Sequence, residues 1–145
     1  MQARDFMSET VYCCTPDTGL GDVARLMVEY DCGAIPVVES AENKRLVGMV
    51  TDRDITCRCV AQGKNPLEVS ASSCMSSPIV TAHPDTDEHE LIKLMEHHQV
   101  RRIPIVDDAG TCIGIVSQAD IARKASEHET AEVVRDISQP ARKAG

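Results

Sequence analysis

Two short stretches of the sequence place a hydroxyl side chain three residues before an aspartate, directly after an apolar run. The first is GMVTDRD, with Thr51 and Asp54, and the second is GIVSQAD, with Ser117 and Asp120. At the start of a helix, a carboxylate can accept both hydroxyls of a ribose, while free backbone amides there favour an anion. Hydrogen bonds to a charged group contribute about 1.5–3 kcal/mol each. The doubled pattern is therefore typical of a nucleoside site.

The same residues also fit a purely structural role. Thr51 and Ser117 have the side chains that most often cap a helix start, and Asp54 and Asp120 then fall at the third helical position. The residue types alone leave both interpretations open.

The elements that must position these residues are themselves duplicated. At a shift of 68 residues, Met-Ser, Pro-Asp-Thr, Leu-Met and Ile-Pro-x-Val all recur. An internal repeat of this length indicates two copies of one supersecondary unit. We expect a first repeat over 3–60, a connector over 61–74, a second repeat over 75–124, and a C-terminal helix with a tail over 125–145.

Each copy predicts the order β-α-β-β-α. A short strand leads to Pro-Asp-Thr, where Asp17 or Asp85, or the following threonine, would cap a helix. The helix shows apolar spacing at i, i+3, i+4 and i+7, ending on Tyr30 in one copy and His98 in the other. The expected strands are 11–15, 35–38 and 47–50 in the first copy and 79–82, 103–106 and 113–116 in the second. Second helices start near 52–54 and 118–120, and an extra helix covers 127–138.

Composition narrows the classes of function. The formal net charge of −8 over 145 residues argues against non-specific nucleic-acid binding, which needs basic surface. The apolar runs are far shorter than the roughly 20 residues that span a bilayer. The N-terminal stretch lacks the apolar core of a secretory signal. These features predict a cytoplasmic protein that binds neither nucleic acid nor membrane, with its seven cysteines as free thiols.

The duplicated unit resembles a known family. With GAIPVV and TDRDI in one copy, and EHHQVRRIPIV and ADIAR in the other, it is similar to a tandem pair of cystathionine β-synthase (CBS) domains, or Bateman module. The resemblance covers about 3–124 and is greatest to stand-alone two-CBS proteins, including the bacterial hypoxic-response type. It implies an α/β fold of two pseudo-twofold-related β-α-β-β-α repeats, followed by the short C-terminal helix.

The resemblance also implies a function. Such modules are regulatory rather than enzymatic, and they bind adenosine-type ligands such as AMP, ADP, ATP, S-adenosylmethionine or NAD between the repeats. No cofactor is required, although Mg²⁺ can accompany a polyphosphate. A homodimer and an unidentified protein partner are expected on the same basis.

Carried over to this chain, the family pattern assigns two ligand sites. Asp120 would take the ribose hydroxyls, Ser117 the sugar or phosphate, and Ile115 the adenine. The remaining residues of this first site are Thr10, Val11, Gly33, Ala34, Arg101 and Arg102. The second site would use Met49, Thr51, Asp54 and Ile79, with the two arginines nearby. We expect the site of Ser117 and Asp120 to be the better one.

Two other classes of function remain open from the residues. A metal- or thiol-based sensor could assemble its site across a dimer from His83, His89, His97 and the cysteines. No pair of cysteines has the C-x-x-C spacing typical of zinc sites, and we assign no metal ligand. His98 lies on the apolar face of its helix and is expected to be packed. A structural dimerisation module with vestigial sites is the other alternative.

Overall fold

The computed structural model describes residues 1–9, 11–77, 79–124 and 134–138. Their contacts divide the chain into two compact units. The first unit comprises Met1–Glu9, Val80–Asp107 and the chain from Ile113 onward. The second unit comprises Thr10–Ile79 and Asp108–Cys112. Each unit therefore joins segments that are distant in sequence.

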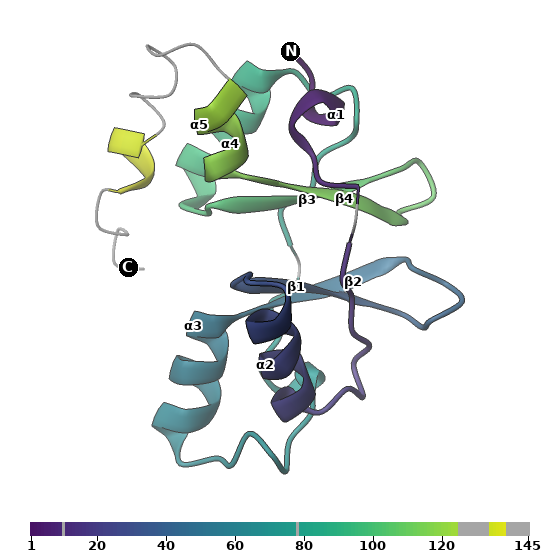
Figure 1. The fold of residues 1–145 in the computed structure, drawn as a ribbon, viewed down its shortest axis with the longest axis vertical. Helices are drawn as coiled ribbons and strands as arrows, with labels where there is room; N and C mark the ends of the chain where they lie inside the picture. Colours follow the sequence, from purple (N-terminus) through teal and green to yellow (C-terminus); the bar gives the residue numbers. More distant parts are fainter. Residues whose placement is uncertain (10, 78, 125–133, 139–145) are drawn as a thin grey trace. The chain divides into compact units, whose positions relative to one another are not determined.

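The second unit contains a helix, a hairpin and a second helical run (Figure 1). Its elements are α2 (Leu20–Glu29), β1 (Ala34–Val38), β2 (Leu46–Thr51) and α3 (Asp52–Asp54), which continues as a π-helix (Ile55–Cys59) and a 3-10 helix (Val60–Gln62). The run ends at Gly63, whose φ of +78° favours glycine. A further 3-10 turn covers Ala71–Ser73.

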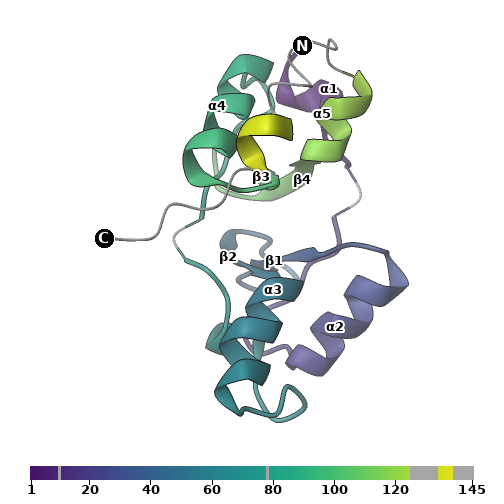
Figure 2. The same ribbon diagram turned by 90° about the vertical axis from the view of Figure 1, so that its left-hand side faces the viewer.

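The first unit repeats this plan with a short helix added at its start. Its elements are α1 (Ala3–Phe6), α4 (Glu88–His98), β3 (Arg102–Val106), β4 (Cys112–Ser117) and α5 (Gln118–Lys124). In each unit the two main helices stand on the same side of the hairpin, α2 with α3 and α4 with α5 (Figure 2).

The two predicted hairpins are confirmed. β1 pairs antiparallel with β2 from Ala34 opposite Thr51 onward, and β3 pairs with β4. The predicted third strand of each copy is wrong as a full strand. Cys14 and Ala82 each make only one isolated parallel bridge, to Val37 and Ile105 respectively. Each sheet is accordingly two-stranded.

The predicted caps of the first helices are also wrong. α2 begins after Gly19, which has no side-chain cap, and α4 begins after Asp87, whose carboxylate accepts from His89 N at 3.1 Å. The threonine hydroxyls instead close the preceding turn, because Thr18 accepts from Thr15 N and its counterpart in the other copy does the same. The helix caps, Gly19 and Asp87, thus lie two residues after the predicted aspartates and one residue after the threonines.

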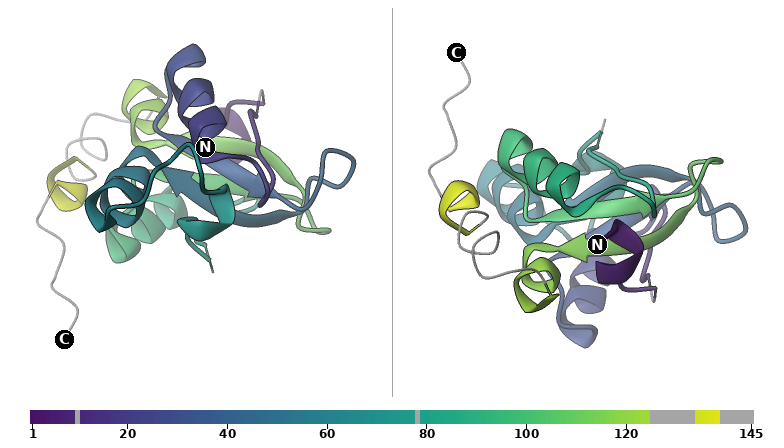
Figure 3. Two further views of the ribbon diagram at one scale, coloured as in Figure 1. Left: turned by 90° about the horizontal axis from the view of Figure 1, so that it is seen from below. Right: turned by 90° about the horizontal axis from the view of Figure 1, so that it is seen from above.

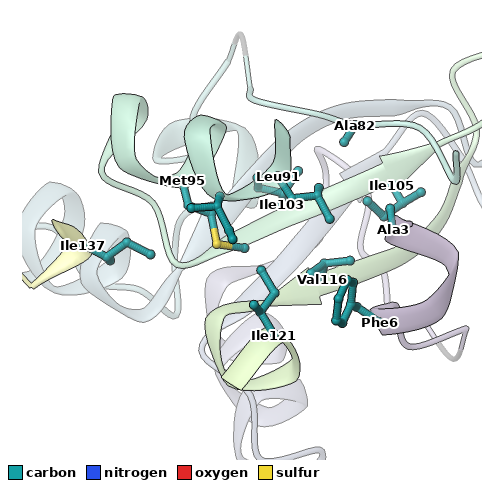
Figure 4. Close-up of a cluster of buried hydrophobic side chains, with 11 residues drawn as sticks. Ala3, Phe6, Ala82, Leu91, Met95, Ile103, Ile105, Val116, Ile121 and Ile137 are labelled. Carbon is teal, nitrogen blue, oxygen red and sulfur yellow. The ribbon is translucent and has the colours of Figure 1, made fainter. Parts of the chain in front are cut away.

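Each unit has its own aliphatic core beneath its helices. Figure 3 shows α2 and the α3 run over one hairpin, and α1, α4 and α5 over the other. In the first unit, side chains from both strands meet those of the helices (Figure 4). The residues labelled there are Ala3, Phe6, Ala82, Leu91, Met95, Ile103, Ile105, Val116, Ile121 and Ile137. Full burial of a Val, Leu, Ile, Phe or Met side chain contributes roughly 1.5–3 kcal/mol.

The two Met-Ser segments are exchanged between the repeats. Met7 and Ser8, from the start of the first repeat, lie against Gly114 of β4, while Met75 and Ser76 lie against Gly48 of β2. A Cβ on Gly114 would come within 2.8 Å of Met7 Sδ and 3.0 Å of the Ser8 carbonyl oxygen. A side chain at Gly48 or Gly114 would therefore force the neighbouring Met-Ser segment to shift. The repeat boundaries predicted from the sequence are not tested by this division and stay a prediction.

Only the end of the predicted C-terminal helix lies within the described residues. Residues 134–137 are helical, and Ile137 is buried in the first unit's core. The rest of that helix and the tail fall outside the described part of the chain. No described helix is both long and apolar enough to cross a membrane.

Candidate functional site

The first candidate carboxylate lies where β2 passes into α3. Thr51 ends the strand and has extended backbone angles, so its side chain can turn back over the first helical turn. Asp54 N donates to Thr51 Oγ1 at 3.0 Å, and Thr51 N donates to Asp54 Oδ2 at 2.9 Å. This reciprocal pair is a capping box.

The second candidate carboxylate repeats this geometry where β4 passes into α5. Asp120 N donates to Ser117 Oγ at 3.1 Å, and Ser117 N donates to Asp120 Oδ2 at 2.8 Å. The capping interpretation is therefore confirmed in both motifs. It uses Oδ2 of each aspartate and fixes the carboxylate against the backbone.

The residue preceding each hairpin also contacts the helix start. Asp52 N donates to the Gly33 carbonyl oxygen at 3.0 Å, and Gln118 N donates to that of Arg101 at 2.7 Å. Gly33 thus lies beside the motif of Thr51, and Arg101 beside that of Ser117. The two helix starts therefore differ in the side chain next to them, since glycine adds no charge and arginine adds a positive one.

An arginine one turn further on faces the second oxygen of each aspartate. Arg123 NH2 donates directly to Asp120 Oδ1, whereas Arg58 Nε lies 3.9 Å from Asp54 Oδ1 and its NH1 points to the Cys74 carbonyl oxygen at 3.5 Å. Sequence reasoning missed both arginines. The signal was available, because a cation three or four residues after an aspartate on a helix can pair with it.

The motifs also differ in charge at the first helical position. The first has Asp52, whose own side chain accepts from Arg53 N at 2.8 Å, while the second has the neutral Gln118. Arg53 follows Asp52 and offsets its charge, so the two motifs carry the same net charge. The difference that matters to a phosphate is the cationic Arg101 beside the second motif, where the first has Gly33.

The apolar positions of the motifs are held by the Met-Ser segments. Met49 is buried and exchanges backbone hydrogen bonds with Ser76, at 3.2 and 2.8 Å. Ile115 is half-buried and exchanges the same pair with Ser8, at 3.3 and 3.0 Å. Ile115 thus keeps some surface that a ligand can contact, while Met49 keeps very little.

The structure brings the predicted site residues together in two groups. Within the first unit lie Ser117, Asp120, Ile115, Arg101 and Arg102. Within the second unit lie Val11, Gly33, Ala34, Met49, Thr51, Asp54 and Ile79. Gly33 and Ala34, predicted for the Asp120 site, lie next to Thr51 inside the second unit, since Ala34 pairs with Thr51 in the hairpin. Thr10 is outside the described residues.

The thiols and histidines do not assemble a site in the described part of the chain. No disulfide joins any of the seven cysteines, and among the described residues no three His, Cys, Asp or Glu side chains are arranged to hold a metal ion. Burial, followed by the neighbouring Cys13 and Cys74, raises the pKa of Cys14 to about 12, so its thiol stays protonated. The prediction that His98 is packed is wrong, because it is exposed and lies edge-on to His97.

Comparison with known proteins decides the family. The model of the CBS domain matches residues 3–59 and again 71–127. The chain belongs to the CBS-domain family. Its two CBS repeats account for the doubled motif, and the fold class predicted from the sequence, α/β with two such repeats, is confirmed. No catalytic family is indicated for the chain.

Several relatives are stand-alone CBS pairs of similar length. The chain is 36% identical over 138 residues to Hypoxic response protein 1 of Mycobacterium tuberculosis, covering 95% of this chain and 94% of that one. A crystal structure of Hypoxic Response Protein I, described as having two coordinated zinc ions, matches with a TM-score of 0.78 over 87% of this chain and 100% of that one, at 36% identity. CBSX2 in complex with AMP matches with a TM-score of 0.74 over 86% and 95%, at 24% identity, a likeness that shows the fold alone.

Proposed function

We propose that this CBS pair is a non-catalytic regulatory module that binds an adenosine-type ligand through Ser117 and Asp120. The observation that carries the proposal is the state of the Asp120 carboxylate. Its side chain is 16% exposed and fixed by the capping box through Oδ2. A carboxylate offers about four lone-pair positions. Ser117 N takes one of them on Oδ2, and the exposed Arg123 takes one on Oδ1 that a ligand can reclaim, so both oxygens can accept from the two hydroxyls of a ribose.

The surroundings of Asp120 favour a ligand that also carries phosphate. Arg101 and Arg102 precede or begin β3 and are exposed, and Arg101 is tied to the helix start through its carbonyl oxygen. A guanidinium suits phosphate oxygens because it presents several donors in a plane. AMP, ADP and ATP therefore fit the proposal best, with Mg²⁺ as a companion of a polyphosphate. The ligand roles of Thr10, Val11, Gly33 and Ala34 stay predictions.

The motif of Thr51 and Asp54 is a second and less favourable site. Its carboxylate is held in the same way, but the residue beside its helix start is Gly33, where the other site has the cationic Arg101. Met49 is almost fully buried, so it offers little surface to an adenine ring. We expect occupancy of this site, with Ile79 as a further contact, only at higher ligand concentration.

A regulatory role requires that ligand binding change the interaction of this protein with another molecule. A ligand changes affinity for a partner only if it binds the two states of the protein differently. The proposed output is a change in affinity for a protein partner, exerted by a cytoplasmic homodimer. Exposed apolar side chains of the second unit, Val28 at 84% and Leu67 at 75%, support a covering partner such as a second copy.

A zinc sensor is the competing function, because the relative of 36% identity is described with two zinc ions. Within one chain, the described residues hold no group of three ligands, so the zinc alternative is a site shared between two chains. A thermal-shift panel with AMP, ADP, ATP, S-adenosylmethionine, NAD(H) and Zn²⁺ separates the two. A ligand at a hundred times its Kd adds about 2.7 kcal/mol, which raises the Tm of a domain of this size by roughly 5–10 °C.

The proposal expects such a rise with an adenine nucleotide in the wild type and its loss in Asp120→Asn. Asparagine keeps a side-chain oxygen for the capping box, so this variant removes the charge without removing the cap. A panel that responds to zinc alone would replace the proposal by the sensor. A panel that responds to nothing would leave the two motifs as helix caps.

A further inference from the structure

We infer that Arg123 competes with the ligand for Asp120. It thereby sets how much the ribose hydroxyls contribute to the affinity for the ligand. The inference rests on the proposed function and concerns a residue that neither the motif nor the family assignment above includes. Arg123 acts through Asp120 rather than through a ligand contact of its own.

The first step is that the two oxygens of Asp120 have separate partners. Oδ2 accepts from Ser117 N, which orients the carboxylate. Oδ1 accepts from Arg123 NH2 across one helical turn. Because the backbone already holds the carboxylate through Oδ2, Arg123 is not needed to orient it. Arg123 instead occupies Oδ1, the oxygen that accepts no hydrogen bond from Ser117 N.

The second step is that this pairing is not a requirement of the fold. In the other motif the capping box has the same distances to within about 0.1 Å, as the four hydrogen bonds above show. Arg58 nevertheless stays 3.9 Å from Asp54 Oδ1 and points to a backbone carbonyl. The capping box therefore forms in this motif with the arginine at ion-pair distance only, without the hydrogen bond that Arg123 makes to Asp120 Oδ1.

The ion pair with Arg123 weakens Asp120 as a hydrogen-bond acceptor. An arginine on Oδ1 takes one lone pair and partly neutralises the carboxylate, so each ribose hydroxyl donates to a weaker acceptor. Arg123 is 69% exposed and Asp120 16% exposed, so the ion pair is close to the surface. Such pairs are worth about 0.2–1 kcal/mol, and less at high salt. The ligand can therefore displace Arg123, at a cost of up to about fivefold in affinity.

The test compares the affinities of AMP and 2′-deoxy-AMP for wild type, Arg123→Gln and Arg25→Gln, measured by calorimetry at low and high salt. Arg25 is a matched control, because it makes the same i,i+3 ion pair on α2, at 2.7 Å, with Asp22, which belongs to neither motif. Both substitutions remove one positive charge, and AMP and 2′-deoxy-AMP carry the same phosphate, so an effect of the lost charge on the phosphate cancels in the ratio of their affinities.

The inference expects Arg123→Gln to raise the ratio of AMP affinity to 2′-deoxy-AMP affinity by about two- to fivefold, and Arg25→Gln to leave it unchanged. The difference in this ratio between Arg123→Gln and wild type should become smaller at high salt. A purely structural effect of the substitution would not depend on salt in this way. A ratio equal to that of wild type or lower, while Asp120→Asn still weakens AMP, would overturn the inference and leave the proposed function standing. Absence of AMP binding to the wild type would overturn both.

Discussion

At the scale of single residues, Asp120 has two roles that a substitution must separate. Its Oδ2 completes a capping box, and its charge is proposed to hold a ribose. Replacement by alanine removes both roles, so a loss of binding in Asp120→Ala has two explanations. Replacement by asparagine keeps an acceptor oxygen and removes only the charge. Asp120→Asn is therefore the informative variant.

The cap itself predicts a stability effect. Ser117→Ala removes the acceptor for Asp120 N, and loss of such a cap costs about 1 kcal/mol. For a domain of this size the Tm should fall by roughly 3 °C, as measured by thermal unfolding without ligand. Ser77→Ala, at an exposed position outside the helices and strands, is the control and should change the Tm by less than about 1 °C. Equal Tm values for the two variants would contradict the cap.

The buried thiol of Cys14 predicts a pH dependence. Its pKa is raised by burial from 9.0 to about 12 in the folded state, so the unfolded chain loses this proton first. Between about pH 9 and 12 the unfolded state binds fewer protons, and the free energy of unfolding falls as pH rises. Urea denaturation at pH 8 and pH 10 should show a larger fall for wild type than for Cys14→Ala. Identical falls would show that Cys14 does not titrate in this way.

At the scale of elements, the strand glycines carry the packing of each motif. Gly114→Ala places a methyl group 2.8 Å from Met7 Sδ and 3.0 Å from the Ser8 carbonyl oxygen. Overpacking of this kind costs about 1–3 kcal/mol, which urea denaturation would report. In contrast, a Cβ on Gly19 has its nearest neighbour, Asp22 Oδ2, at 3.9 Å. Gly19→Ala should be clearly milder, and a milder Gly114→Ala would refute the close approach.

The hairpins and capping boxes could be predicted because their signals are local. Alternating and continuous apolar runs marked β1 to β4, and a hydroxyl three residues before an aspartate marked both helix starts. The packing of Met7 against Gly114 could not be predicted, because it joins segments more than 100 residues apart in the sequence. The cap of α4, Asp87, was missed because the hydroxyl of the predicted Thr86 accepts from His83 N in the preceding turn instead.

The pairing of Arg123 with Asp120 was partly predictable. Its i,i+3 spacing allows the contact, but the same motif carries Arg58 at i+4 in the other repeat, where a backbone carbonyl attracts the guanidinium instead. Which partner an exposed arginine takes depends on the neighbouring backbone, and sequence spacing does not give that.

At the scale of the whole molecule, self-association is proposed and is testable. Val28 is 84% exposed on α2, where an apolar side chain in water gains from being covered. Sedimentation equilibrium should show a dimer, and Val28→Glu should weaken it by tenfold or more, because each chain would bury a charge. Asp85→Asn, on an exposed turn of the first unit, is the control. A wild-type monomer at high micromolar concentration would contradict the proposal.

The most direct measurement is a calorimetric titration of AMP into wild type, Asp120→Asn and Asp85→Asn, since the two variants make the same change in charge. The account predicts binding to the wild type and to Asp85→Asn with equal affinity. It predicts a loss of about tenfold to a hundredfold in Asp120→Asn, the equivalent of one charged hydrogen bond. Equal affinity in all three proteins would show that the charge of Asp120 does not bind the ribose, and would contradict the account.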